Sequence, residues 1–348
     1  MDVPLHAGLR PEGTVDVAVA ARVARTWVAG GIVGLPTETV YGLSADAQNF
    51  DAVARVYRAK ERPVDHPVIV HVAGPEAIEG WSAAPNEAAH RLAEVFWPGP
   101  LTLVIARGSR AGDFLTGGQD TVALRCPDHR VALACLAALV GQSRDPARGV
   151  AAPSANRFGR VSPTCAADVL DEVGARLDPA RDLVVDGGPC AVGVESTIVD
   201  CTASPPRVLR LGAISQAQVD AALAGAAAGP EAGPVDGAAA PVRAPGTLDA
   251  HYAPRATVVL EAGPTLGAHD LDPTLVGLLA EVEVATPSGW TRLAAPRTVQ
   301  EYARDLYAAL RRADERGLAT VVAVLPDAAQ GPLAHAVADR LARAAHGR

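Results

Sequence analysis

The chain has a single lysine, Lys60, among its 31 lysine and arginine residues. Arginine is a planar fork with several hydrogen-bond donors, whereas lysine is a compact point charge on a flexible stem, so the two do not interchange at a packed site. A lysine kept in so arginine-rich a chain is typical of a residue that contacts a phosphate or a carboxylate group. The alternative is that Lys60 survives by chance at the end of a helix, where a cation is favourable.

Other small polar and basic side chains follow short apolar runs that are typical of strands. The segments are GLPTETVYGL (34–43), Lys60 with Arg62, Arg125, APSAN (152–156), DGGPCAVGVESTIVD (186–200) with Ser196, and LRLG (209–212) with Arg210. Each segment alone has an ordinary explanation, because threonine and serine cap helices, glycines form turns and arginines are solvated. Ligands of α/β proteins bind at the ends of strands, so the shared location of these segments predicts a binding site.

The sequence excludes several common ways of binding or transforming a ligand. Lys60 is not preceded by the glycine spacing of a P-loop, and no Gly-x-Gly-x-x-Gly motif opens a helix after a strand. Neither Walker-type phosphate binding nor a usual dinucleotide fold is therefore expected. The Gly-x-Ser-x-Gly motif of many hydrolases is missing as well. His66 and His71 have no third metal ligand nearby, and we predict no metal-binding residues.

Composition favours a reduced, cytoplasmic protein. The five cysteines are odd in number and none forms a Cys-x-x-Cys pair, which argues against a disulfide framework and a zinc ribbon. The N-terminus lacks the apolar core of a signal peptide, and no run of about 18 apolar residues is present. The net charge of −8 argues against a chain that coats nucleic acid, so any site for a polyanion must be a local pocket.

The length of 348 residues suggests two domains, and composition changes sharply once between them. Residues 223–246 are almost entirely Ala, Gly, Pro and Val without periodicity, which is typical of a flexible linker. We therefore expect a large domain over residues 1–222, a linker over residues 223–255 and a smaller α/β domain over residues 256–348.

Strand-like apolar runs alternate with amphipathic helical patterns in both domains, which indicates α/β sheets covered by helices. Strands are expected at residues 32–35, 68–72, 101–106, 122–125, 183–185, 196–199, 256–260 and 319–325. Helices are expected at residues 14–27, 51–60, 87–96, 130–140, 164–173, 215–223, 299–316 and 332–345. Because no helical pattern separates the runs at 101–107 and 121–125, we expect the larger sheet to be mixed rather than purely parallel.

A series of motifs occurs in the order of a known family. They are PTETVYGL, KxRPxxxP, IVHV, FWPGPLT, TVALRCP, APSAN and DGGPCxVGVESTIVD. Together they resemble the L-threonylcarbamoyladenylate synthase family, with its YrdC-like domain, over residues 31–214. The segment PGTLDAHYAP (245–254), followed by a small α/β domain, is similar to the long, two-domain form of that family, in which we expect a Rossmann-like C-terminal domain.

The resemblance implies a twisted open mixed sheet with a concave, positively lined surface, and a nucleotidyltransferase activity. Family members form threonylcarbamoyl-AMP and pyrophosphate from L-threonine, bicarbonate and ATP, for modification of the tRNA adenosine next to the anticodon. Mg²⁺ is expected to accompany ATP, and tRNA and a downstream threonylcarbamoyl-transferase are expected partners, with no membrane. Joining a carbamate to the α-phosphate brings two anions together, so fixed cations and donors, rather than a covalent nucleophile, are required.

The resemblance also assigns roles to individual residues. The Lys-x-Arg and Ser-x-Asn signatures, taken as catalytic, fall on Lys60, Arg62, Ser154 and Asn156. The L-threonine side of the pocket corresponds to Thr39, His71, Arg125, the backbone of Ala152, and Ser196. The ATP side corresponds to Arg62, His66, Thr121, Ser154, Ser162, Arg210 and Tyr252. Lys60, as a point charge, suits a phosphate or carbamate oxygen, and the arginines suit bidentate capture of phosphate or carboxylate.

The sequence departs from the family pattern at a few positions. His66 stands where many members have asparagine, so its charge depends on pH. Phe158 replaces a small residue, Leu211 a proline and Thr247 a methionine. None of these changes removes a charged group of the pocket, and we expect activity.

The segment at 245–254 contains proline, histidine and tyrosine, unlike the linker before it. It is predicted to act as a lid over the cleft, with Tyr252 reaching ATP and the C-terminal domain serving as its anchor. Alternatively, His251 and Tyr252 only pack against the edge of the second domain.

Two other functions remain open. Hydrogenase maturation proteins use a related domain to handle a carbamoyl adenylate, but they also carry acylphosphatase-like and zinc-finger modules, which this sequence lacks. A module that binds double-stranded RNA or tRNA without chemistry is opposed by the net charge of −8, although a local basic face is compatible with it.

Overall fold

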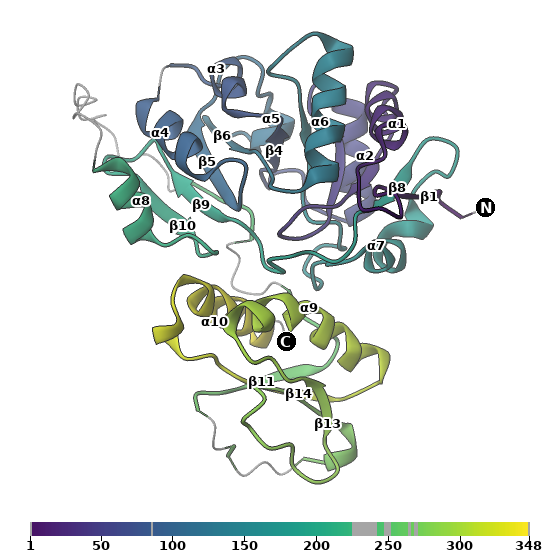
Figure 1. Ribbon diagram of the computed structural model, residues 1–348, viewed down its shortest axis with the longest axis vertical. Helices are drawn as coiled ribbons and strands as arrows, with labels where there is room; N and C mark the ends of the chain where they lie inside the picture. Colours follow the sequence, from purple (N-terminus) through teal and green to yellow (C-terminus); the bar gives the residue numbers. More distant parts are fainter. Residues whose placement is uncertain are drawn as a thin grey trace.

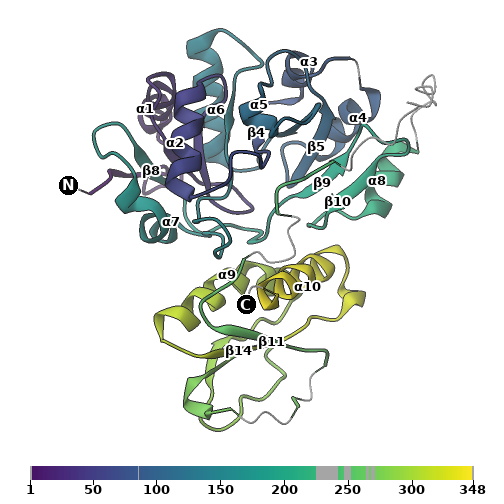
Figure 2. The same cartoon turned by 180° about the vertical axis from the view of Figure 1, so that it is seen from behind.

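The computed structural model describes residues 2–84, 86–224, 242–246, 252–263, 266–267 and 271–346. They form a large N-terminal α/β unit and a smaller second α/β unit, which lies below the first in Figure 1. Helices α9 (Val299–Glu315) and α10 (Pro332–Ala345) lie between the sheet of the second unit and the N-terminal unit, as the view from behind also shows (Figure 2). Residues 225–241 and 247–251 of the predicted linker, with Thr247 and His251, lie outside the described residues.

A ten-stranded sheet forms the centre of the N-terminal unit, in the order β1-β8-β2-β3-β7-β4-β6-β5-β9-β10. Its strands are β1 (Leu5–Ala7), β2 (Val33–Leu35), β3 (Gly42–Asp46), β4 (Ile69–Val72), β5 (Leu101–Ala106), β6 (Thr121–Arg125), β7 (Gly149–Ala151), β8 (Leu183–Asp186), β9 (Thr197–Asp200) and β10 (Arg207–Arg210). Strands β4 and β6 run parallel, whereas β5 and β6, and likewise β4 and β7, run antiparallel. The prediction of a mixed sheet is confirmed.

Helices bury both faces of this sheet. They are α1 (Val17–Val28), α2 (Phe50–Lys60), α3 (Ile78–Trp81), α4 (Glu87–Phe96), α5 (Asp113–Thr116), α6 (Arg130–Ser143), α7 (Ala166–Val173) and α8 (Gln216–Leu223). The side chains of Asp16, Asn49, Asn86 and Ser215 accept hydrogen bonds from first-turn amides and so fix where α1, α2, α4 and α8 begin. One buried cluster joins α1 and α6 to β2, β7 and β8, and a larger one joins α2 and α4 to β3, β4 and β5.

Four strands of the large sheet, β1, β3, β7 and β10, are absent from the sequence predictions. Strands β3 and β7 are short and rich in glycine and alanine, and β3 carries the polar residues Ser44 and Asp46, so no apolar run marks them. In the sheet Ser44 donates to the carbonyl of Val33 at 2.7 Å, and Asp46 forms an ion pair with Arg148. The one-turn helix α5 also lies between β5 and β6, where no helix is expected.

The second unit has a four-stranded sheet in the order β11-β14-β12-β13, whose pairs are all parallel. Its strands are β11 (Thr257–Glu261), β12 (Val276–Leu279), β13 (Thr291–Ala294) and β14 (Thr320–Val324). Thr298 caps α9 and Pro332 occupies the first turn of α10, as expected for helix starts. The sequence predicts β11, β14 and both helices but not β12 and β13. Within the described ranges, no helix is long and apolar enough to cross a membrane.

Candidate active site

A cavity lies between the large sheet and the segment that leads into the second unit. It is lined by Thr37, Thr39, Val40, Gly42, Arg62, Pro67, Val68, Ile69, His71, Arg125, Ala152, Pro153, Ser154, Glu195, Ser196, Arg210, Pro245, Gly246 and Tyr252. The fold thus brings together the segments after β2, α2 and β7, the last residues of β6 and β10, and the segment before β9.

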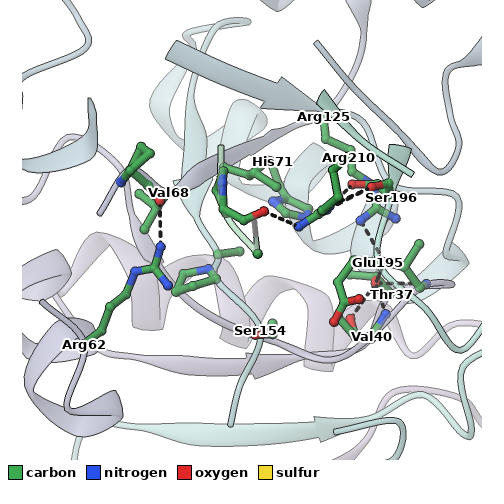
Figure 3. Close-up of a pocket in the computed structure, with 18 of the residues that line it drawn as sticks. Thr37, Val40, Arg62, Val68, His71, Arg125, Ser154, Glu195, Ser196 and Arg210 are labelled. Carbon is green, nitrogen blue, oxygen red and sulfur yellow. Dashed lines mark hydrogen bonds between the residues drawn. The ribbon is translucent and has the colours of Figure 1, made fainter. Parts of the chain in front are cut away.

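Many residues that the sequence analysis assigned to the pocket line this cavity. They are Thr39, His71, Arg125, Ala152 and Ser196 of the expected threonine side, and Arg62, Ser154, Arg210 and Tyr252 of the expected ATP side. Lys60, His66, Thr121, Asn156 and Ser162 are not part of the lining. Figure 3 shows Arg62 at one end of the cavity and Arg125 and Arg210 at the other.

Arg125 is buried at the end of β6 and is held from several directions. Its Nη1 donates to Oγ1 of Thr39 at 2.7 Å, and its Nε donates to the carbonyl of Gly99 at 3.2 Å. Its Nη2 lies 2.6 Å from Oε1 of Glu38 in a buried ion pair. All these partners belong to the N-terminal unit, so the sheet and its loops alone fix this cation.

His71 lies beside Arg125, because β4 and β6 are paired in register at these two residues. Burial, together with the charge of Arg125, lowers the pKa of His71 to about 3, so the imidazole is neutral at ordinary pH. Its Nδ1 is buried and has no hydrogen-bond partner among the described residues. The ring can therefore hydrogen-bond a ligand without bringing a charge.

Arg210 ends β10 and is buried at the same end of the cavity. Its Nε and Nη2 donate to the carbonyl of Ser196 at 3.0 and 2.9 Å, and its Nη2 also donates to Oγ of Ser196 at 3.0 Å. Its Nη1 donates to the carbonyl of Pro245 at 2.8 Å. These acceptors are neutral oxygens, so they orient the guanidinium without neutralising its charge.

Arg62 lies two residues beyond α2, which ends where Glu61 adopts a left-handed conformation with φ of 54°. The guanidinium carbon is 6.0 Å from the ring centre of Tyr57 and 5.9 Å from that of Phe158, and Nη2 donates to the carbonyl of Pro67 at 2.8 Å. Its Nε is buried with no hydrogen-bond partner among the described residues. Aromatic faces therefore hold this cation at the cavity wall while N–H donors remain for a ligand.

Lys60 is 1% exposed, and its ammonium donates to the backbone carbonyls of Ser154 and Asn156. Burial lowers its pKa well below the ordinary value. Asn156 in turn donates through Nδ2 to the carbonyls of Arg157 and Arg160, each at 2.8 Å. The two residues brace the turn that presents Ser154 to the cavity, and a direct contact between Lys60 and a substrate stays a prediction.

Glu195 is a buried carboxylate of the cavity wall that has no assigned role in the sequence analysis. Its Oε1 accepts from Oγ of Ser162 at 2.7 Å, and its Oε2 accepts from the hydroxyl of Tyr307 and from Nε of Arg340, both at 2.8 Å. Burial raises the pKa of Glu195, but Arg340 and Arg210 outweigh it and hold the pKa at about 2. Two of its three donors belong to the second unit.

Tyr252 follows the predicted linker and lies in the cavity wall, 1% exposed. Its ring stacks on Tyr307 with 5.7 Å between ring centres, and its backbone is left-handed with φ of 63°. Gly246, with φ of 76°, lies so close that a Cβ there would be 2.3 Å from the Tyr252 hydroxyl. Tyr252 thus both packs against the second unit and lines the cavity.

His66 and Thr121 lie outside the lining of the cavity. The His66 ring makes an edge contact with Phe158, with 5.3 Å between ring centres. Thr121 is the first residue of β6 and is partly exposed. Within the described residues, no group of three or more His, Cys, Asp or Glu side chains is arranged to hold a metal ion.

Two family profiles match consecutive parts of the chain. Residues 25–212 match the family of Sua5, YciO and YrdC, described as telomere recombination. Residues 214–346 match the profile described as threonylcarbamoyl-AMP synthase, C-terminal domain. The boundary between the two profiles falls just before α8.

Relatives match across both units. The threonylcarbamoyl-AMP synthase of Bacillus subtilis is 37% identical over 344 residues, which are 96% of this chain and 94% of the relative. The threonylcarbamoyl-AMP synthase of Pyrococcus abyssi is 37% identical over 303 residues, 84% of this chain and 85% of the relative. The crystal structure of P. abyssi Sua5 complexed with L-threonine is similar with a TM-score of 0.80 and 32% identity, over 99% of this chain and 98% of that chain.

Proposed function

The chain belongs to the threonylcarbamoyl-AMP synthase family in its two-domain form, and on this premise we propose that it makes threonylcarbamoyl-AMP and pyrophosphate from L-threonine, bicarbonate and ATP. The observation that carries the proposal is a cavity lined by Arg62, Arg125 and Arg210 together with threonine and serine hydroxyls. A reaction that joins a carbamate to a phosphate must overcome the repulsion of two anions, and fixed cations lower that barrier. The activity is that of a nucleotidyltransferase.

The end of the cavity around Arg125 is proposed to hold L-threonine. Arg125, Thr39 and Ser196 offer a cation and two hydroxyl groups to the polar groups of the amino acid. Neutral His71 can hydrogen-bond the amine, or the carbamate formed when the amine captures CO₂ from bicarbonate, and the backbone of Ala152 offers further polar groups. The similar P. abyssi structure contains L-threonine, which supports this assignment.

Arg62 and Arg210 are proposed to hold the triphosphate of ATP from the two ends of the cavity. Ser154, Ser162, Tyr252, His66 and Thr121 complete the proposed ATP side. A carbamate oxygen attacks the α-phosphorus, the bond from the α-phosphorus to its bridging oxygen breaks, and pyrophosphate leaves with the electron pair. Holding the two reactants in line can supply roughly 7–11 kcal/mol, so no covalent intermediate is needed.

Lys60 and Asn156 are proposed to act on the reaction through the Ser154 turn that they brace. The Lys60 ammonium meets two carbonyl oxygens of that turn. The two residues of the Lys-x-Arg signature thus have different roles. Arg62 lines the cavity, and Lys60 holds the turn that forms part of its wall.

Magnesium is proposed to enter as a complex with ATP and to be held by phosphate oxygens. Mg²⁺ keeps several waters and is usually bound by substrate phosphates with one or two carboxylates. Among the described residues that line the cavity, Glu195 is the one carboxylate, and it already accepts three hydrogen bonds. The residues present therefore fit an ion that is carried by the substrate.

The segment with Gly246 and Tyr252 is proposed to be a lid that closes over ATP. Both residues line the cavity, and Pro245 accepts a hydrogen bond from Arg210. A closed lid would keep water from an adenylate that hydrolyses readily. The Gly246→Ala variant tests this, because its Cβ would meet the Tyr252 hydroxyl. We expect more hydrolysis of threonylcarbamoyl-AMP per pyrophosphate released; an unchanged ratio would contradict a lid.

Pyrophosphate release from ATP, with L-threonine and bicarbonate omitted in turn, tests the proposed reaction. We expect release only when both are present with Mg²⁺. Release that is indifferent to bicarbonate would overturn the assignment. RNA binding without chemistry would instead show tRNA affinity that falls steeply with salt and no pyrophosphate. The product is proposed to supply a transferase that modifies an adenosine of tRNA.

A further inference from the structure

Arg340, on the last helix of the second unit, contacts three segments of the cavity. Its Nε donates to Oε2 of Glu195 and its Nη2 donates to the carbonyl of Leu211, both at 2.8 Å. Its guanidinium carbon lies 5.4 Å from the ring centre of Tyr252. Leu211 directly follows Arg210, and Glu195 and Tyr252 line the cavity. One buried side chain, 1% exposed, therefore joins the second unit to the part of the site where Arg210 lies.

Glu195 is an anion in the wall of a cavity that is proposed to bind a triphosphate. Without partners it would repel the phosphates or pair with Arg210, whose charge acts on it. Instead, its two carboxylate oxygens accept hydrogen bonds from Ser162, Tyr307 and Arg340. Arg210 meanwhile donates only to neutral oxygens in the contacts described above, and its charge remains available to a ligand.

We propose that Arg340 is a positioning residue for the ATP side of the cavity, which pairs with Glu195 and thereby keeps that carboxylate off Arg210. The inference rests on the proposed function and deepens it, since it makes the second unit a part of the active site. Stability alone accounts poorly for this arrangement, because a buried ion pair is often no more stabilising than well-packed apolar residues of similar volume.

The Arg340→Met variant of the full chain tests the proposal, because methionine fills part of the volume without the charge. With Arg340 gone, Glu195 turns to Arg210, and the Michaelis constant for ATP rises about tenfold, equivalent to about 1.4 kcal/mol. The Michaelis constant for L-threonine changes by less than about threefold. Arg312→Met is the matched control, because Arg312 lies on α9 of the same unit and donates to Ala308 of its own helix.

A second substitution separates positioning from packing. In the double variant Glu195→Gln with Arg340→Met the competing charge is removed, and the Michaelis constant for ATP returns to within about threefold of the wild-type value. A merely structural role of Arg340 predicts no such recovery. A wild-type Michaelis constant in Arg340→Met, or a double variant as impaired as the single one, would overturn the proposal.

Tyr307→Phe provides the same test if Arg340→Met fails to fold. It removes one donor to Glu195 and keeps the ring that stacks on Tyr252. We expect a rise of about threefold in the Michaelis constant for ATP, cancelled by Glu195→Gln. No change, or a change that Glu195→Gln leaves in place, would count against the proposal.

Binding of a non-hydrolysable ATP analogue distinguishes this inference from the proposed function. If the wild-type chain binds the analogue but releases no pyrophosphate, the proposed reaction fails and the analogue still measures the effect of Arg340→Met. If the wild-type chain is active and Arg340→Met binds the analogue normally, the reaction stands and the positioning role fails.

Discussion

Two neighbouring groups of cavity residues, one around Arg125 and His71 and one around Arg210, are held in place in different ways. Around Arg125 and His71 the side chains come from paired strands of one sheet, and the buried ion pair of Arg125 with Glu38 lies within the N-terminal unit. Around Arg210 the wall also includes Tyr252, and the buried ion pair of Glu195 with Arg340 joins the two units. Arg125 and His71 of the proposed threonine side are thus held by the N-terminal unit, whereas the wall around Arg210 on the proposed ATP side depends on the docking of the second unit.

This difference gives the second unit of the two-domain form a role in the proposed ATP side of the cavity. Val40, Val161 and Val194 of the N-terminal unit share a buried cluster with residues of α9 and α10. The loops that carry Thr39, Ser162 and Ser196 therefore pack against the second unit directly. Because Arg125 and His71 are held within the N-terminal unit, substitutions at the interface should weaken ATP binding more than threonine binding, and substitutions within the sheet should do the reverse.

Gly193→Ala should change ATP binding relative to threonine binding more than the other variants do. Gly193 has φ of 83°, and a Cβ there would lie 2.4 Å from the Cα of Arg304 in α9. We expect the units to be forced apart, the dissociation constant for ATP to rise about thirtyfold, and that for L-threonine to change by less than about threefold, as measured by calorimetry.

Gly188→Ala is the control for backbone strain at Gly193. It has nearly the same φ, 84°, but a Cβ there meets no atom within 4 Å. If both variants weaken ATP binding equally, the effect comes from strain in the loop and not from the docking of the second unit.

Arg125→Lys is expected to act on the proposed threonine side of the cavity. Lysine cannot reach Thr39, Gly99 and Glu38 together, because it lacks the fork. We predict a rise of about tenfold in the Michaelis constant for L-threonine, with that for ATP nearly unchanged. The exposed Arg207 provides the control Arg207→Lys. A larger effect on ATP than on threonine would contradict the assignment of Arg125 to the threonine side.

Lys60→Arg should affect the use of both substrates, because the turn with Ser154 lies between Arg62 and Arg125 (Figure 3). The guanidinium is too broad to replace an ammonium that meets two carbonyl oxygens. We expect turnover to fall about tenfold, or about 1.4 kcal/mol in the barrier, together with some loss of stability from overpacking. Turnover close to wild type would favour the chance survival of this lysine.

The smallest expected effect is the pH dependence of stability that is caused by His71 on the proposed threonine side. The pKa of His71 is about 3 in the folded chain and 6.5 as the ordinary value, so the unfolded chain binds the extra proton and stability is lost as pH falls below 6.5. From pH 7 to pH 5.5 this loss is about 1 kcal/mol. Between the two pH values, urea unfolding should show a loss of stability that is about 1 kcal/mol smaller in His71→Gln than in the wild-type chain. Equal pH dependence of the two chains would show that His71 does not cause it.

Glu195, on the proposed ATP side, should not titrate in that range. The pKa of Glu195 is about 2 against an ordinary value of 4.5. Its depressed pKa contributes stability that is present above about pH 4.5 and is lost as pH falls through about 2.

The fold could be predicted from the sequence where periodicity is strong. Strand β5 and helices α4 and α10 begin and end at the predicted residues. Strands β3 and β12 could not be predicted from the sequence. Strand β3 carries buried polar side chains and both strands contain glycine, so the apolar pattern of each is interrupted. Both are buried because they pair with neighbouring strands in the sheet.

The site could be predicted in part, because motifs mark polar residues near strand ends. The pairing of Glu195 with Arg340 could not, since 145 positions separate them. A signal was nevertheless present. Arg340 occupies the buried stripe of α10 with Ala336, Val337, Leu341 and Ala344, and an arginine in an apolar stripe needs a buried partner.

Amide hydrogen exchange of the full chain, measured with each ligand added separately, tests the central claim most directly. We predict that a non-hydrolysable ATP analogue protects amides of α9 and α10 as well as the loop before β9, because the ATP side is completed by the second unit. L-threonine should protect the turn after β2 and strands β4 and β6, and leave the second unit unchanged. Protection by the ATP analogue that is confined to the N-terminal unit would contradict the account.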